Sequence, residues 1–129
     1  MKHKLTIRVY YEDTDMAGIV YYANYLRFIE RGRSEWVRDI GLDQNRMLEE
    51  DGVVFAVRRV EADYLGSAKL DDELVVETEP TVITGARLVM HQKVKRGEEV
   101  LFAADVTIAT VSSTGQPVRL PPEVRRLLH

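Results

Sequence analysis

Residues 8–40 read RVYYEDTDMAGIVYYANYLRFIERGRSEWVRDI, and three different local patterns follow one another within them. Residues 5–10 alternate apolar and polar side chains, which predicts a half-buried strand. The acidic residues 12–15 should end that strand, because Asp and Thr favour turns and helix caps. Gly18 then marks a tight turn or a short irregular helix. A long helix is expected over residues 21–40.

The expected helix carries one apolar stripe, as in an amphipathic helix that packs on a core. The stripe comprises Tyr22, Tyr25, Leu26, Ile29, Gly32, Trp36, Val37 and Ile40. Glycine in the middle of a helix costs about 1 kcal/mol relative to alanine. Gly32 therefore predicts a close approach between the helix backbone and whatever packs against it, and Gly41 should end the helix.

The rest of the chain reads as strands joined by short connections. The expected elements are a short helix over residues 44–50, strands over residues 53–63, 74–84, 87–95 and 100–112, and a terminal helix from Pro122 through Leu128. Short connections favour antiparallel neighbours, and the last strand, the longest and most apolar, is expected to lie centrally. One long helix can then bury its stripe only on the concave face of the sheet. The sequence predicts an α+β fold, a curved five-stranded antiparallel sheet wrapped around one long central helix, as a single domain of residues 1–129.

Composition narrows the class of protein. The chain of 129 residues is 45% hydrophobic and 30% charged, which is typical of a globular domain. A net charge of -3 argues against nucleic acid as a partner, because phosphate binding needs a basic face. The absence of cysteine fits a reducing cytosol, and no apolar run predicts a signal peptide or a membrane span. We expect a soluble, cytoplasmic protein, with an oligomer as an open option.

Several common catalytic motifs are absent. The sequence has no nucleophile elbow, no phosphate-binding lysine loop and no dinucleotide glycine fingerprint. The three histidines, His3, His91 and His129, lie far apart in sequence, and none accompanies a carboxylate at metal-ligand spacing. These absences argue against serine hydrolysis and metal catalysis, and we expect neither a metal nor a cofactor.

The remaining candidates are the acids Asp13 and Asp15, together with Glu12 beside them, just before the expected helix. An aspartate can activate water as a general base or attack a carbonyl directly. The first turn of a helix offers free N–H groups and a partial positive charge, which suit an oxyanion that develops on an ester or thioester. The two features together would serve acyl hydrolysis without a histidine. Alternatively, either acid could simply cap the helix, a duty that Thr14 could share.

The tyrosines at the helix start are also open to two interpretations. Tyr22 and Tyr25 lie on the expected stripe, so packing in a core or an interface is an alternative to donation of a hydrogen bond during catalysis. Asn24 between them could bind either the backbone or a ligand.

A family resemblance covers nearly the whole chain. The matching pieces are Arg8-Val9, Thr14-Asp15, Gly18-Ile19-Val20 and Ala23-Asn24-Tyr25, within the fuller run of residues 10–31. They resemble the signature of 4-hydroxybenzoyl-CoA thioesterase-type hotdog proteins. The fuller run is similar to the YbgC-type acyl-CoA thioesterases, which are encoded beside the Tol–Pal cell-envelope system.

The resemblance implies a cofactor-free hydrolysis of acyl-CoA to CoA and a carboxylic acid. Asp15 matches the catalytic aspartate, as nucleophile or general base. Tyr22 matches the position whose backbone N–H polarises the thioester carbonyl. Gly18 matches the glycine that lets the loop approach the substrate. Asn24 and Tyr25 complete the expected set of substrate-binding residues. Members of the family are dimers or dimers of dimers, so a homodimer or a homotetramer is expected, with sites between subunits. Some are similar to proteins that bind acyl carrier protein.

Tyr22 departs from the Tol–Pal-associated relatives, many of which carry histidine there. With tyrosine in place of histidine, the backbone N–H at position 22 is kept, but the imidazole side chain is lost. The tyrosine form also occurs in the hydroxybenzoyl branch, so a short aliphatic acyl group and an aryl group are both open. The alternative functions are a module that binds acyl carrier protein or envelope-lipid enzymes with residual hydrolysis, and a hydratase or dehydratase, which would want a histidine near the helix.

Overall fold

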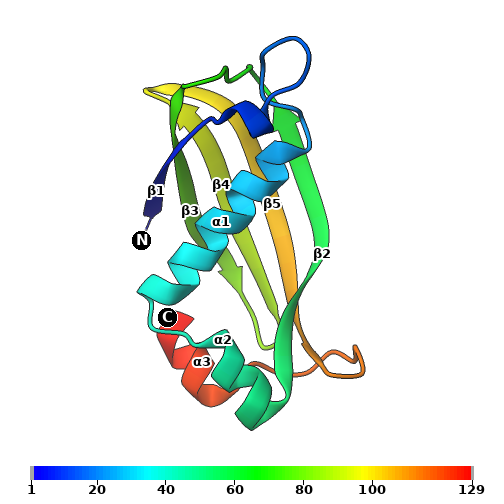
Figure 1. Cartoon of the computed structure of the whole chain (residues 1–129). Helices are drawn as coiled ribbons and strands as arrows, with labels where there is room; N and C mark the ends of the chain where they lie inside the picture. The colour runs from blue at the N-terminus through cyan, green and yellow to red at the C-terminus, as the bar shows by residue number, and fades with distance from the viewer. Residues whose placement is uncertain (1, 129) are drawn as a thin grey trace.

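The computed structural model of the chain describes residues 2–128. Its strands are β1 (His3–Arg8), β2 (Val53–Tyr64), β3 (Glu73–Ile83), β4 (Arg87–Arg96) and β5 (Glu99–Ser112). They form one antiparallel sheet in the order β1-β3-β4-β5-β2. The long helix α1 (Asn24–Asp39) lies across the concave face of this sheet (Figure 1). The predicted α+β architecture, a five-stranded sheet around a central helix, is confirmed.

Shorter helices complete the chain. A 3-10 turn, η1 (Tyr11–Asp13), follows β1, and α2 (Gln44–Arg46) continues into a π-helical turn, η2 (Met47–Asp51). The Asp43 carboxylate caps α2 by accepting a hydrogen bond from Arg46 N–H at 3.1 Å. The terminal helix α3 (Pro122–Leu128) lies beside α2 (Figure 1), where the sequence predicted it. No helix within residues 2–128 is long and apolar enough to cross a membrane.

The position of the longest strand was predicted only in part. β5 has a neighbour on each side, as expected of an interior strand, but β4 occupies the middle of the sheet. Both faces of β5 carry apolar side chains because one face packs on the core and the other is lined by small residues such as Ala103 and Ala109.

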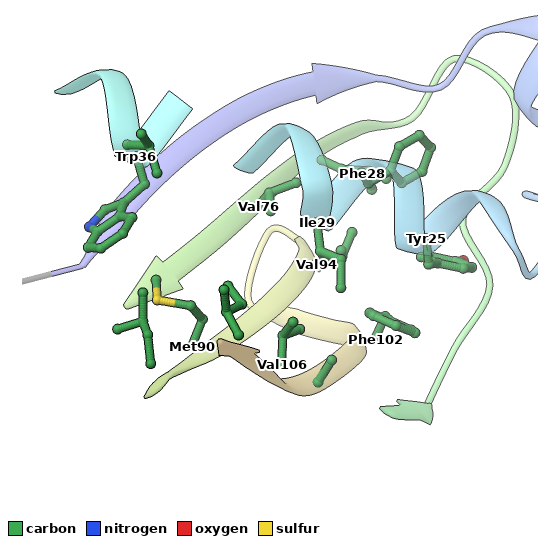
Figure 2. Close-up of a cluster of buried hydrophobic side chains, with 14 of the residues drawn as sticks. Tyr25, Phe28, Ile29, Trp36, Val76, Met90, Val94, Phe102 and Val106 are labelled. Atoms are coloured by element: carbon green, nitrogen blue, oxygen red, sulfur yellow. The ribbon is translucent and has the colours of Figure 1, made fainter. Parts of the chain in front are cut away.

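The core lies between α1 and the sheet. Figure 2 shows Tyr25, Phe28, Ile29 and Trp36 of the helix facing side chains of β3, β4 and β5. Phe28 and the strand residues opposite are fully or almost fully buried, and each such side chain contributes about 1.5–3 kcal/mol through removal from water. The amphipathic stripe of α1 therefore holds the helix in place on the sheet.

Gly32 is the point where α1 comes closest to the sheet. A Cβ atom placed there would lie 2.7 Å from Val76 Cγ1, 2.9 Å from Thr78 Oγ1 and 3.3 Å from Gln92 Nε2. Gln92 is fully buried, and its Nε2 donates hydrogen bonds to Ile29 O and Thr78 Oγ1, both at 2.8 Å. The close approach expected from the mid-helix glycine is confirmed.

The predicted start and stripe of the helix need correction. The helix begins at Asn24 rather than Tyr21, because the N–H of Tyr21 donates to Asp13 O and holds the preceding residues in a turn. Tyr22, 62% exposed, and Leu26, 41% exposed, do not belong to the buried face, whereas Phe28 does. The helix is rotated relative to the predicted stripe.

The inner face of the edge strand β2 is left uncovered. The backbone of the helix lies closest to β1, β3 and β4, and Tyr25 reaches only the end of β2 at Tyr64, so most of β2 extends beyond the helix on one side (Figure 1). Val57, Val60 and Tyr64 on that strand are each exposed by 41–50%. The fold thus presents a long strand edge with apolar side chains beside it.

Candidate active site

Asp15 lies in a small hairpin of residues 14–20, called here the Asp15 hairpin. Its two ends pair as an antiparallel bridge, and Asp15 N–H donates to Ile19 O at 2.9 Å. The turn closes with Gly18 N–H on Asp15 O at 3.0 Å, and Gly18 has a φ of 77°, a left-handed conformation that glycine adopts without strain. The side chain of Asp15 accepts Ala17 N–H through Oδ1 at 2.9 Å. The predicted tight turn is confirmed, and it holds an exposed carboxylate at its start.

The hairpin is fixed to the body of the protein through residues 68 and 69. Ile19 pairs with Lys69 in an antiparallel bridge, and Val20 N–H donates to Ala68 O at 2.9 Å. Ala68 N–H in turn donates to the hydroxyl of Tyr25 at 3.0 Å. Because Tyr25 is buried on α1, this chain of contacts ties the hairpin to the helix.

Asp13 connects the base of the hairpin to the start of α1. Its backbone oxygen accepts the N–H of Tyr21 and the side-chain amide of Asn24, both at 2.9 Å. Its carboxylate accepts Tyr10 N–H at 2.8 Å and closes the η1 turn. Asn24 is buried, so of its two expected partners, backbone and ligand, the structure shows the backbone.

The start of α1 carries no side-chain cap. Its N-cap residue is Ala23, and the carboxylates of Asp13 and Asp15 bind elsewhere, so the hypothesis that either acid caps this helix is wrong. Within the described residues 2–128, the N–H groups of Tyr22 and Ala23 form no hydrogen bond. The positive end of the helix therefore offers two N–H groups without a partner among residues 2–128, and the exposed carboxylate of Asp15 precedes it by a few residues along the chain.

Aromatic rings pack together at this end of the helix. Tyr25 stacks on Phe102 with ring centroids 5.1 Å apart, and Tyr64 contacts both rings edge-on. The Tyr64 hydroxyl donates to Tyr22 O at 3.2 Å, so the edge strand β2 supports the peptide that precedes α1. Burial raises the pKa of Tyr25 and of Tyr64, so both phenols stay neutral and can donate or accept hydrogen bonds.

The five predicted site residues lie along the Asp15 hairpin and the start of α1, in two groups. Asp15, Gly18 and Tyr22 are exposed, whereas Asn24 and Tyr25 are buried and hold the backbone around them. Sequence reasoning missed Tyr64, Ala68 and Lys69, which lie about forty to fifty residues further along the chain. No local pattern marks them, because their role depends on where β2 ends in space.

Neither described histidine lies at the Asp15 hairpin. His3 Nε2 lies 2.8 Å from an Asp39 carboxylate oxygen, and His91 Nδ1 lies 2.8 Å from one of Asp105. His129 lies outside the described residues. Over residues 2–128, no three His, Asp or Glu side chains gather closely enough to hold a metal ion. The residues that remain at the site are an aspartate, backbone N–H groups and tyrosines.

Comparison with known proteins identifies the family. Residues 17–103 match the family model described as the thioesterase superfamily, and the chain belongs to this family. The acyl-CoA thioesterase YbgC of Haemophilus influenzae is 43% identical over 124 residues, which cover 95% of this chain and 91% of that protein.

Two solved structures illustrate the shared hotdog fold. A probable thioesterase from Bartonella henselae has a TM-score of 0.89 and 40% identity, and the match covers 94% of this chain and 100% of that one. The 4-hydroxybenzoyl CoA thioesterase from Pseudomonas sp. strain CBS-3 has a TM-score of 0.89 over 98% of both chains. At 23% identity, the second likeness concerns the fold alone.

Proposed function

We propose that this chain hydrolyses acyl-CoA thioesters with the carboxylate of Asp15 as the reactive group. The chain is an acyl-CoA thioester hydrolase, like its YbgC relative. The observation that supports Asp15 is its free carboxylate oxygen. Oδ1 is held by Ala17 N–H, and among residues 2–128 no Lys or Arg side chain forms an ion pair with it. Oδ2 is therefore available to a water molecule or to the thioester carbon.

Two routes use this carboxylate. As a general base, Asp15 would take a proton from water, whose oxygen adds to the thioester carbonyl carbon. Collapse of the tetrahedral intermediate would then expel the CoA thiolate, which takes up the proton. As a nucleophile, Asp15 would form a mixed anhydride with the acyl group and expel the same thiolate, and water would then release the acid.

The start of α1 suits the negative charge that develops on the carbonyl oxygen. Tyr22 and Ala23 offer backbone N–H groups without other partners among the described residues, at the positive end of a sixteen-residue helix. Tyr64 keeps that peptide in place by donating to Tyr22 O. The backbone donor does not depend on the side chain at position 22, so tyrosine is compatible with this role.

The Asp15 hairpin is open to solvent in the single chain, and a second copy would close it. The uncovered edge of β2, with Val60 and Tyr64 beside it, is the surface that we propose for a homodimer, and dimers of dimers would give the expected tetramer. Exclusion of water strengthens the electrostatic contribution of the helix end. The cytoplasmic location, the Tol–Pal link and acyl carrier protein as a partner stay predictions from the sequence.

The test is steady-state hydrolysis of acetyl-, butyryl-, hexanoyl-, palmitoyl- and 4-hydroxybenzoyl-CoA by wild type and Asp15→Asn. Loss of the reactive carboxylate should lower kcat by about 100- to 10,000-fold, with the melting temperature unchanged. Glu12→Gln, an exposed acid next to the hairpin, is the matched control and should keep full activity. An Asp15→Asn variant with wild-type turnover would show that another group does the chemistry. In a single turnover in oxygen-18 water, label in the protein requires the anhydride, with water attacking its aspartyl carbonyl carbon.

A further inference from the structure

A candidate ligand site away from the Asp15 hairpin is a cavity of about 330 Å³ under the second half of α1. One wall is formed by Arg33, Ser34, Trp36 and Val37 of the helix, and the floor by apolar side chains of the sheet. The floor comprises Phe55, Val57, Leu88, Met90 and Ile108. The volume falls in the range of small-molecule sites, and the lining is mostly apolar, as such sites usually are.

Arg33 is the unusual member of this lining. It is partly buried, and no carboxylate within residues 2–128 lies within ion-pair distance of its guanidinium. Its one hydrogen bond runs from Nη1 to Gln92 Oε1 at 3.0 Å. A guanidinium has five N–H donors and remains protonated in proteins, so most of its donor capacity is left for a ligand.

The position of the Arg33 guanidinium is fixed by the buried side chain of Gln92. Gln92 is fully buried, and its Nε2 is committed to Ile29 O and Thr78 Oγ1, so its Oε1 can only point toward Arg33. Burial lowers the pKa of Arg33, and the nearby Glu30 opposes that effect. Buried charges are normally paired, and here the pairing partner is not supplied by the described chain.

We propose that this cavity, the Arg33 cavity, binds a carboxylate that carries an apolar chain of medium length. The carboxylate would lie on the guanidinium, and the chain would lie on the floor against Met90 and Ile108. This inference rests on the proposed function, which offers two sources for such a ligand. One is the free acid that hydrolysis releases, and the other is the distal carboxylate of a dicarboxylic acyl-CoA. Pairing of β2 with a second copy would close the side of the cavity at Val57.

Glu30 provides a second test of the proposal, with an effect opposite to that of Arg33. Its exposed carboxylate also lines the cavity, three residues before Arg33 on the same helix, and it repels an anionic ligand. Replacement of Glu30 by glutamine should therefore strengthen the binding of a carboxylate, while Arg33→Gln should weaken it. A purely apolar cavity predicts no change in either variant.

The experiment is direct calorimetric titration of the full chain with hexanoate and with hexanol. Hexanoate should bind wild type at least about tenfold more tightly than hexanol, and Arg33→Gln should lose that preference. Arg27→Gln removes an equal charge from an exposed position of the same helix outside the cavity and should bind hexanoate as wild type does. Equal binding of the acid and the alcohol, or no binding of hexanoate, would overturn the proposal.

Because the readout is binding, its failure is distinct from a failure of the proposed hydrolysis. If Arg33→Gln fails to fold, as a melting curve would show, the Glu30→Gln variant carries the test alone. Hydrolysis of adipoyl-CoA and hexanoyl-CoA then distinguishes the two sources. A rise in KM for adipoyl-CoA alone in Arg33→Gln identifies a distal carboxylate, and inhibition of wild type by hexanoate that the variant lacks identifies the free acid. An unchanged KM and unchanged inhibition in this variant would refute both.

Discussion

Replacement of Gly32 by alanine tests the packing of α1 on the sheet. The added methyl group would lie 2.7 Å from Val76 Cγ1, 2.9 Å from Thr78 Oγ1 and 3.3 Å from Gln92 Nε2. Nonbonded carbon atoms pack best at about 3.5–4.0 Å, so the helix and β3 would have to separate by roughly 0.8 Å or more. Gln92 is held by two hydrogen bonds that its amide nitrogen donates, and it cannot move aside alone.

Two opposing contributions determine how much Gly32→Ala changes the free energy of unfolding. Overpacking of a core costs about 1–3 kcal/mol, and the better helix propensity of alanine returns about 1 kcal/mol. Since the methyl group meets both β3 and β4, we take the upper part of that range and expect a net loss of about 1–2 kcal/mol. For a domain of this size, the loss corresponds to a fall in Tm of roughly 3–10 °C.

The assay is urea unfolding at fixed protein concentration, followed by the fluorescence of Trp36, the only tryptophan of the chain and a buried one. Arg27→Ala, on an exposed position of the same helix, reports propensity alone and should leave stability nearly unchanged. Val76→Ala removes the nearest methyl groups, so its combination with Gly32→Ala should cost less than the sum of the two single changes. If Gly32→Ala is as stable as wild type, the close-contact reasoning is refuted.

Two further variants probe the surroundings of the site. Asn24→Ala removes the side-chain amide that donates to Asp13 O, so it should lower the free energy of unfolding by about 1 kcal/mol. It should also speed hydrogen exchange of the Tyr21 amide, which donates to the same oxygen, and unchanged exchange there would contradict the contact. Burial raises the pKa of Asp72, but the hydrogen bonds from Lys69 N–H and Arg96 outweigh it and hold this pKa below its ordinary 3.8. The ionised carboxylate therefore stabilises the fold above about pH 4, and that contribution is lost as pH falls further. Urea midpoints of wild type and Asp72→Asn should accordingly differ at pH 7 and converge near pH 2, and a constant difference would exclude this origin.

The fold could be predicted because its periodicities are local. Alternation of two residues in the strands and spacing of three and four in the helix require no knowledge of the partner surface. The exact buried face of α1 could not be predicted in the same way. Leu26 and Phe28 are both apolar, and the choice of Phe28 depends on the rotation of the helix at its closest contact, Gly32.

The residue types of the candidate site could be predicted from the sequence, but the contacts that position them could not. Asp13 and Asp15 are two residues apart and equally suited to a helix cap, so composition could not separate them. The path of the chain does, because the backbone oxygen of Asp13 binds Tyr21 and Asn24 while Asp15 is carried away on the hairpin. Ala68 holds the hairpin through a hydrogen bond from Val20 N–H, although the two residues are more than forty positions apart. No short sequence pattern predicts such a non-local contact.

The two sites lie at opposite ends of β2, and this has a consequence for the proposed dimer. Tyr64 at the end of β2 supports the start of α1, whereas Phe55 near its beginning lines the Arg33 cavity. A two-fold pairing of β2 with its copy is antiparallel, so it would bring the Asp15 hairpin of one chain toward the cavity of the other. If hydrolysis takes place beside Asp15 as proposed, the carboxylate product would be repelled by that acid and attracted by Arg33. The same pairing that closes the reactive site would thus also give the released acid a place to bind.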